Sequence, residues 1–165
     1  MGVSGSGKTT VGRKVARRLG WEFVDADDFH SAEAVQKMSS GSPLDESDRE
    51  PWLARLAAEI RTRAASGTGT VFACSALREH YRRTLAGRNP GEVVFVFLHA
   101  GREVLERRLA ARRGHFFRPE LLASQLAALE EPKDTVRVDA SGSPADVAEG
   151  VVRALGRGRK RAEIA

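Results

Sequence analysis

The sequence predicts an α/β fold, in which a parallel β-sheet lies between two layers of helices. Short apolar segments alternate along the chain with longer segments that show helical spacing. The apolar segments are continuous, as at residues 93–99 (VVFVFLH), which is typical of parallel strands that are buried on both faces. With 165 residues, the chain is long enough for one domain with its own core. We therefore expect a three-layer sandwich.

The elements follow from local patterns taken in order. Val11, Val15 and Leu19 recur at helical spacing, so a helix is expected over residues 10–19. A short strand at 21–24 runs into a group of acidic residues. The other expected strands are 70–74, 93–99 and 135–138, and the other expected helices are 32–40, 51–66, 78–86, 102–113, 119–130 and 144–155.

A complete phosphate-binding loop, G-x-x-x-x-G-K-[ST], stands at residues 2–9. Its glycines allow the tight turn that points backbone N–H groups at an anion, and the helix that follows adds positive potential. Lys8 is expected to reach the β- and γ-phosphates, and the Thr9 hydroxyl to ligate Mg²⁺. The motif predicts a P-loop NTPase fold. The residues expected to hold ATP are Gly2, Ser4, Gly5, Ser6, Gly7, Lys8, Thr9 and Thr10.

The first, central strand of such a fold is missing from the sequence. A buried strand normally feeds directly into the phosphate-binding loop, whereas only Met1 precedes Gly2. We expect this to open the sheet between the strands at 70–74 and 93–99. About five to seven mainly apolar residues, encoded in frame before Met1, would match a typical strand. We expect the chain to be less stable without them, because a strand buries several apolar side chains.

Acidic residues follow the first expected strand, at Asp25, Asp27 and Asp28. Open α/β sheets bind their ligands where strands end, and side chains two apart on a strand face the same way, so Asp25 and Asp27 are expected to converge. One carboxylate can hold the water shell of a metal ion while the other orients and deprotonates an attacking hydroxyl. The alternative is a solvated turn in which Asp28 or Ser31 caps the next helix.

Composition restricts the class of protein. No apolar run approaches the roughly 18 residues of a membrane span, and no signal peptide is evident. The single Cys74 excludes an internal disulfide and suits the cytoplasm; it is most simply a small buried residue. The net charge of +5 owes much to a basic tail at 157–165, which argues against a nucleic-acid partner, because such a tail is more often a solvated terminus.

A second basic group, Arg107, Arg108, Arg112 and Arg113, precedes a glycine-hinged aromatic segment at 114–118. This pattern is typical of a lid that closes on ATP, excludes water and brings an arginine to the transferring phosphoryl group. The alternative, a solvated basic helix face, must hold for at least one or two of these arginines. We expect residues 1–156 to form one domain with a lid near 112–130.

Seven segments in order resemble the small P-loop gluconate kinases, relatives of shikimate kinase. The resemblance extends from Gly2 to about Val138 and departs from the family pattern at Ser31, Ala34 and Arg83. The segments are GVSGSGKTT; Asp25-x-Asp27-Asp28-x-His30; Lys37-Met38-x-x-Gly41-x-Pro43-Leu44; Asp48-Arg49-x-Pro51-Trp52-Leu53; Ala73-Cys74-Ser75-Ala76-Leu77-Arg78 with Tyr81-Arg82; Arg112-x-Gly114-His115-Phe116; and Leu121-Leu122-x-Ser124-Gln125 with Leu129-Glu130-x-Pro132.

The resemblance implies ATP-dependent phosphorylation of D-gluconate, and it assigns roles. It implies that Lys8, Asp27 and Arg112 are catalytic, with Asp25 on the metal side beside Thr9. Asp27, His30, Arg49, Ser75, His115 and Gln125 would contact the sugar acid.

Each of these roles has an alternative. Arg49 can fork a carboxylate or only form a surface ion pair, and His30 can donate to a hydroxyl or only pack. Trp52 and Leu53 are better explained as core. Two other functions stay open, a related kinase such as one for shikimate and a nucleotide-binding protein without kinase activity. A homodimer is also left open.

Overall fold

The computed structural model describes residues 1–87, 90–111, 119–133 and 135–162, and it has the expected α/β architecture with parallel strands. The helices are α1 (Lys8–Leu19), α2 (Ala32–Ser39), α3 (Glu46–Ala65), α4 (Glu79–Ala86), α5 (Arg102–Ala110), α6 (Pro119–Ala128) and α7 (Pro144–Ala162). The strands are β1 (Glu22–Asp25), β2 (Thr70–Ala73), β3 (Val96–His99) and β4 (Val136–Asp139), with short 3₁₀ helices η1 (Ala26–Phe29) and η2 (Pro90–Glu92). None of the helices within these described ranges is long and apolar enough to cross a membrane.

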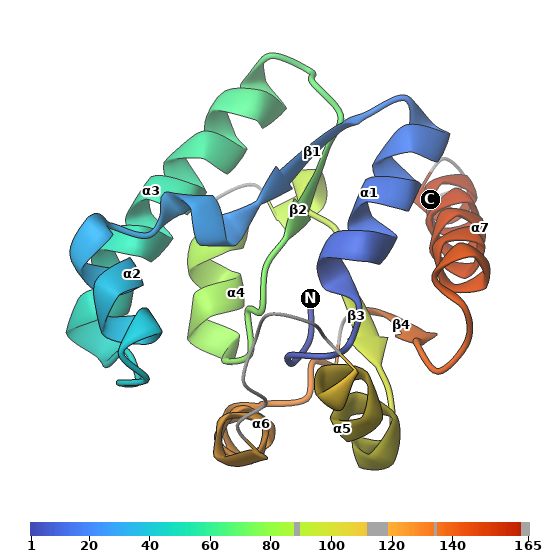
Figure 1. The fold of residues 1–165 in the computed structure, drawn as a ribbon. Coiled ribbons are helices and arrows are strands. Elements are labelled where there is room, and N and C mark those ends of the chain that lie inside the picture. The colour runs from blue at the N-terminus through green and yellow to red at the C-terminus, as the bar shows by residue number, and fades with distance from the viewer. Residues whose placement is uncertain (88–89, 112–118, 134, 163–165) are drawn as a thin grey trace.

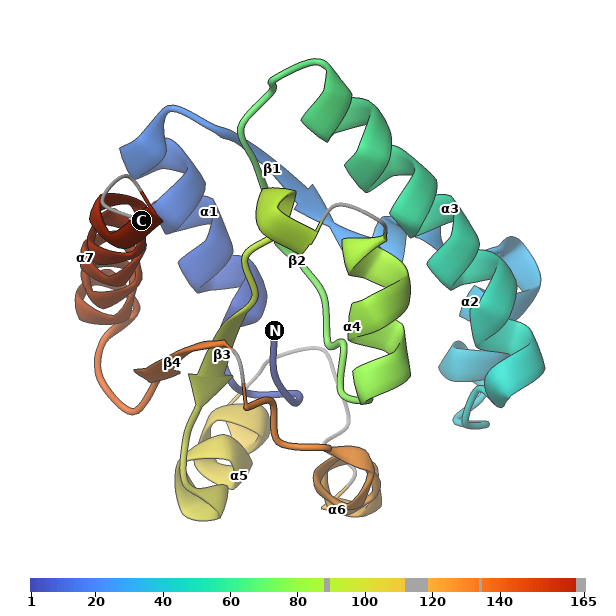
Figure 2. The ribbon, with the colours of Figure 1, turned by 180° about the vertical axis from the view of Figure 1, so that it is seen from behind.

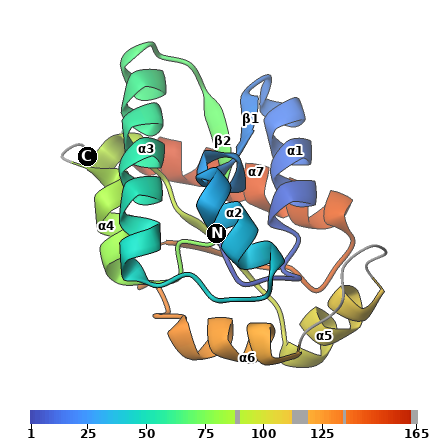
Figure 3. The same ribbon diagram turned by 60° about the vertical axis from the view of Figure 1, so that its left-hand side comes forward.

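Helices cover the strands on both faces. Helix α1 packs against α7 on one side, and α3 packs against α4 on the other, with the strands between them (Figures 1 and 3). Helices α5 and α6 lie below the carboxyl ends of the strands, at the same end of the molecule as α2 (Figure 1). That end is where open α/β sheets bind their ligands.

The strands form two separate parallel pairs rather than one sheet. β1 pairs with β2 from Glu22↔Thr70 to Asp25↔Ala73, and β3 pairs with β4 from Val96↔Val136 to His99↔Asp139. The N-terminus lies between the two pairs (Figure 2). The described residues therefore show the opening in the sheet that the sequence predicts.

Met1 and Gly2 connect the two pairs at the ligand-binding end. The Met1 amino group donates to Val96 O (2.5 Å), and Leu98 N donates to Met1 O (2.9 Å). On the other side, Gly2 N donates to Ser75 O, just after β2 (3.2 Å). Met1 and Gly2 thus supply part of the backbone pairing of a central strand, where the phosphate-binding loop begins.

Several boundaries differ from those predicted. Helix α3 begins at Glu46 rather than at residue 51, because Asp45 and Asp48 form a reciprocal capping box at its N-terminus. Pro51 therefore lies inside the helix, where its ring nitrogen cannot donate to a carbonyl one turn earlier. Helix α7 continues to Ala162, past the predicted end at 155 and into the basic tail.

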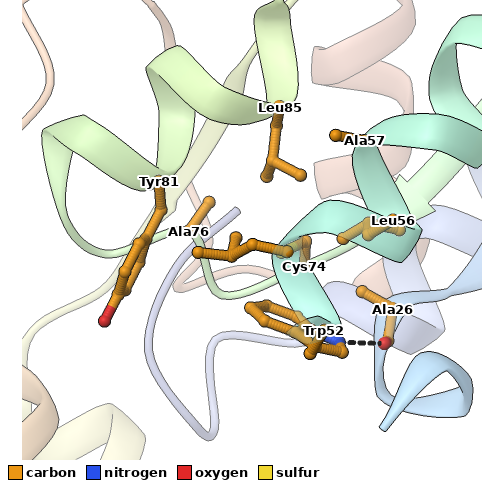
Figure 4. Close-up of a cluster of buried hydrophobic side chains, with 9 residues drawn as sticks. Ala26, Trp52, Leu56, Ala57, Cys74, Ala76, Tyr81 and Leu85 are labelled. Carbon is orange, nitrogen blue, oxygen red and sulfur yellow. Dashed lines mark hydrogen bonds between the residues drawn. The ribbon is translucent and has the colours of Figure 1, made fainter. Parts of the chain in front are cut away.

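The core beside β2 fixes the first half of the molecule. Trp52 and Leu53 of α3 are buried, as predicted, together with Leu56 and Ala26. Trp52 Nε1 donates to Ala26 O at 2.7 Å, so the indole is held by a buried hydrogen bond as well as by packing (Figure 4). Because Ala26 opens η1, this contact attaches the acidic segment to the core.

Candidate active site

The phosphate-binding loop has the backbone that its glycines predict. Gly2, Gly5 and Gly7 all have positive φ, and a Cβ at Gly2 would lie 2.7 Å from Leu98 O, so a side chain is excluded there. Helix α1 begins at Lys8 with no side-chain cap on its first turn. Its first N–H groups are therefore available to an anion, as phosphate binding requires. The Lys8 ammonium folds back over the loop and donates to Val3 O (3.0 Å).

The predicted metal-side residues meet. Thr9 Oγ1 donates to Asp25 Oδ2 at 3.0 Å, which joins the start of α1 to the end of β1. A hydroxyl and a carboxylate are the oxygen ligands that suit Mg²⁺, which takes its remaining ligands from water and phosphate rather than from an all-protein cage. No group of three or more His, Cys, Asp or Glu that could hold a metal ion occurs among the described residues.

Asp25 and Asp27 converge, but not for the reason that the sequence suggested. The strand ends at Asp25, and Asp27 lies on η1, so the two side chains do not share the face of one strand. They approach because the chain turns, with Asp27 N donating to Asp25 Oδ1 (3.3 Å). Desolvation of its carboxyl group and then the charge of Asp25 raise the pKa of Asp27, while Lys8 opposes that shift. A carboxylate with a raised pKa is suited to accept a proton.

His30 is held against the core beside this turn. Its ring stacks on Trp52, with centroids 4.8 Å apart and planes within 8° of parallel. Its Nδ1 atom is buried and has no hydrogen-bond partner among the described residues. Desolvation lowers the pKa of His30, so the imidazole is neutral at pH 7 and can exchange a hydrogen bond with a ligand. Ser31 caps α2, as the alternative for this segment proposed.

Arg49 lies one turn before Trp52 on α3, on the ligand side. Its guanidinium is 3.5 Å from Tyr81 Oη and 3.5 Å from a carboxylate oxygen of Glu46. The position of Arg49 is therefore compatible with both predicted roles, binding of a substrate carboxylate and a surface ion pair, because its contact with Glu46 is long. Tyr81 and Glu46 were not identified from the sequence as site residues, since their contacts join α3 to α4 across 35 positions of the chain.

The end of β2 is shaped by a buried arginine. Arg82 of α4 is 8% exposed and donates to Ala76 O, Leu77 O and Glu130 O. These bonds fix a segment in which Ala76 has a φ of 43°, an unusual value for a residue with a Cβ. Cys74 is buried, as predicted, and burial raises the pKa of its thiol to about 11.

Ser75 and Gln125 both lie against the phosphate-binding loop. Ser75 O accepts from Gly2 N, and Gln125 Oε1 accepts from Ser4 N (2.7 Å). The second contact anchors α6 on the loop, which the sequence did not predict for Gln125. The predicted lid residues Arg112 and His115 lie outside the described residues. Of the other lid arginines, Arg108 donates to Ser141 O and Gly142 O, away from the acidic turn.

A loop with free amides at a helix start, a hydroxyl–carboxylate pair for a metal and a carboxylate with a raised pKa define a P-loop phosphotransferase. The comparisons agree, since the family model described as an AAA domain matches residues 1–132. The chain is 47% identical over 146 residues to a probable gluconokinase of Xenopus tropicalis, covering 80% of this chain and 77% of that protein. It is 44% identical over 156 residues to a gluconokinase of Gluconobacter oxydans, covering 93% and 87%.

Among solved structures, a gluconokinase from Sinorhizobium meliloti 1021 has a TM-score of 0.89 and 40% identity, covering 99% of this chain and 93% of that one. An APS kinase of Mycobacterium tuberculosis, at 20% identity and a TM-score of 0.67, shows only that the fold is shared. This chain belongs to the gluconokinase family.

Proposed function

We propose that this protein transfers the γ-phosphoryl group of ATP to the terminal hydroxyl of D-gluconate, giving 6-phosphogluconate. The observation that carries the proposal is the Thr9–Asp25 hydrogen bond. It brings the turn that bears Asp27 and His30 to the start of α1, where the phosphates would lie. The acceptor residues and the nucleotide loop thus share one edge of the molecule.

Asp27 is the general base in this proposal. Its raised pKa makes it a stronger proton acceptor than an ordinary aspartate. It orients the terminal hydroxyl of the sugar acid and accepts its proton as the oxygen attacks the phosphorus atom. The nearby His30 is neutral and can hydrogen bond to a neighbouring hydroxyl of the acceptor.

The phosphate side relies on backbone N–H groups and one ammonium. The amides of the loop and of the first turn of α1 hold the phosphates, and Lys8 stabilises charge on the transferring group. We propose Mg²⁺ as the metal, held by Thr9 and, through water, by Asp25; when bound, it neutralises charge on the phosphate oxygens. Arg112 is proposed to add a guanidinium from the lid.

Arg49 is proposed to bind the carboxylate of the acceptor, because its planar guanidinium can contact both carboxylate oxygens. Ser75, His115 and Gln125 are further proposed contacts to the acceptor. For Gln125, the hydrogen bond to Ser4 N favours a role in supporting the phosphate-binding loop while the acceptor is bound.

A coupled assay of ATP turnover tests the proposal, with gluconate, shikimate, a nucleoside monophosphate or no acceptor. Gluconate should be turned over far faster than the other acceptors. Faster turnover with shikimate would assign a related kinase, and nucleotide binding without turnover of any acceptor would indicate a binding protein. Equal rates with all acceptors would refute the gluconate assignment.

We also propose the cytoplasm as the location of the enzyme. The only cysteine, Cys74, is buried as a free thiol, which suits a reducing compartment. ATP, which the reaction consumes, is an intracellular metabolite. Measuring activity in the soluble and periplasmic fractions of an expressing bacterial cell would test this location.

A further inference from the structure

The carboxylate of Glu46 is surrounded by donors from two helices. Tyr81 Oη lies 2.8 Å from Oε1 and 3.0 Å from Oε2, and Arg78 Nη1 donates to Oε1 at 2.8 Å. Arg49 Nη1 lies 3.5 Å from the same Oε1, and His80 Nε2 lies 3.4 Å from Oε2. Both oxygens of one carboxylate therefore face an arrangement of guanidinium, phenol and imidazole groups, which we call the Glu46 cluster.

The Glu46 cluster holds more positive charge than one carboxylate neutralises. In the described part of the chain, neither Arg49 nor Arg78 forms an ion pair with any other acid. The hydrogen bond from Tyr81 and then the charges of Arg78 and Arg49 lower the pKa of Glu46, so it carries its charge at neutral pH. The cluster has the donor set that a carboxylate ligand needs, namely two planar guanidiniums and a hydroxyl.

The Glu46 cluster lies beside the proposed acceptor site. Arg49 lies three residues before Trp52 on α3, and the indole of Trp52 stacks on His30, next to the turn that bears Asp27. Arg78 directly follows the segment after β2 whose Ser75 contacts the phosphate-binding loop. An extended acceptor whose hydroxyl meets Asp27 can therefore direct its other end toward the cluster.

Glu46 and its partner Tyr81 differ in how firmly their side chains are held. Tyr81 is 6% exposed and packs in the core (Figure 4), so its hydroxyl is fixed in place. The Glu46 side chain is 52% exposed and lies at the first position of α3. Glu46 can rotate into water while Tyr81 remains, so another carboxylate can enter without leaving a charge buried and unpaired.

We propose that Glu46 occupies the binding position of the substrate carboxylate until the acceptor displaces it. This inference rests on the proposed phosphorylation of gluconate and adds Arg78 and Tyr81 to Arg49 as residues that select an acid over a neutral sugar. The exchange replaces one anion by another between the same donors. The apparent affinity for gluconate is therefore lowered by the fraction of molecules in which Glu46 holds the position.

Steady-state kinetics of Glu46→Gln and Arg78→Gln test the inference. Glu46→Gln weakens the internal competitor and should lower the KM for gluconate about three- to tenfold. Arg78→Gln removes a charged donor and should raise that KM at least about tenfold, and it should reduce the preference for gluconate over the neutral alcohol glucitol. Tyr81→Phe should raise the KM by less. The KM for ATP should stay unchanged in all three variants.

Matched controls come from the same two helices. Glu59→Gln breaks an ion pair with Arg63 within α3, and Arg83→Gln breaks one with Glu79 within α4. Neither should change the KM for gluconate. If Glu46→Gln raises that KM and lowers the melting temperature, Glu46 only joins the two helices and the inference is wrong. It is also wrong if Arg78→Gln behaves like Arg83→Gln.

Failure of the proposed function gives a different result. Wild-type protein that phosphorylates another acceptor but not gluconate refutes the function, and this inference with it. If the wild-type protein phosphorylates gluconate but Glu46→Gln or Arg78→Gln gives the contrary result described above, only the inference is refuted.

Discussion

The phosphate-binding loop and the acidic turn at Asp25–His30 face the same reaction but are positioned in different ways. The loop is shaped mainly by its own backbone, with positive φ at three glycines and a helix that starts within the motif. The acidic turn is held by distant side chains, since Thr9 binds Asp25, Trp52 binds Ala26 O and Arg55 binds Phe29 O. Local sequence determines the first region, whereas the second depends on packing between remote segments.

The strongest effect should come from the backbone that precedes the loop, because only Met1, which pairs with β3, and Gly2, which pairs with Ser75 after β2, connect the two strand pairs there. We predict that five to seven apolar residues added before Met1 raise the melting temperature and the kinase activity. Each buried apolar side chain contributes about 1.5–3 kcal/mol, so a strand is comparable to the stability of a whole domain. Thermal unfolding and the coupled assay measure both effects.

A glycine–serine extension of the same length is the control for that experiment and should have little effect, since it buries almost no apolar surface. Equal melting temperatures and activities for the apolar extension and the original chain would contradict the prediction. The loop would then be supported well enough by the contacts of Met1.

Asp27→Asn tests the acidic turn. An amide cannot accept the hydroxyl proton, so turnover should fall about 10²–10⁴-fold while nucleotide binding persists. In the wild-type enzyme, activity should fall as the pH drops through the pKa of Asp27, which lies above its ordinary value. This acidic limb of the pH–rate profile should be absent from the residual activity of the variant.

Stability should change in the opposite direction from activity in Asp27→Asn. A carboxyl group whose pKa is raised on folding disfavours the folded state when it is ionised, so removing its charge should stabilise the protein above that pKa. The gain should vanish as the pH falls. Asp28→Asn, a change on the same turn, is the control, and equal loss of turnover in the two variants would remove Asp27 from its role as base.

Lys8→Ala tests the loop. Removing one preorganised electrostatic donor typically costs about 10²–10³-fold in turnover, and we expect a loss of at least about 10² here. The backbone of the loop should survive, because the glycines rather than the lysine determine it. Lys14→Ala on the exposed side of α1 should be active, and full activity of Lys8→Ala would show that the loop works by its amides alone.

Trp52→Phe should have a weaker effect than the other variants and tests whether the acidic turn depends on the core. The ring stays, but Ala26 O loses its buried donor, which costs about 1–3 kcal/mol. For a domain of this size, each kcal/mol lowers the melting temperature by about 2–4 °C. Turnover should fall as well, because η1 carries Asp27, whereas ATP binding to the loop should be retained.

Trp21→Phe provides the reference for Trp52→Phe, since it changes the other tryptophan, which lies beside Gly69 at the opposite end of the strands. If Trp52→Phe turns over gluconate as fast as Trp21→Phe does, the acidic turn does not depend on Trp52. A parallel loss of ATP binding in Trp52→Phe would mean that the two regions are not positioned independently.

The α/β class and the phosphate-binding loop could be predicted from the sequence alone. Both rest on interactions local in the chain, namely the φ freedom of glycine and the periodicity of apolar residues. The sequence also named Thr9 and Asp25 as a pair, although for Asp25 and Asp27 it gave the wrong local geometry. The alternation of side chains along a strand does not apply to Asp25 and Asp27, because β1 ends at Asp25 and the chain turns.

The contacts between distant side chains could not be predicted from the sequence. His30 stacks on Trp52, 22 positions away. Gln125 contacts Ser4 across 121 positions, and Glu46 meets Tyr81 across 35. The start of α3 at Glu46 also differs from the prediction. The helix was expected to begin at Pro51, whereas the capping box formed by Asp45 and Asp48 starts it earlier. Side-chain contacts of this kind depend on how helices pack, and packing is set by the whole core rather than by any one segment.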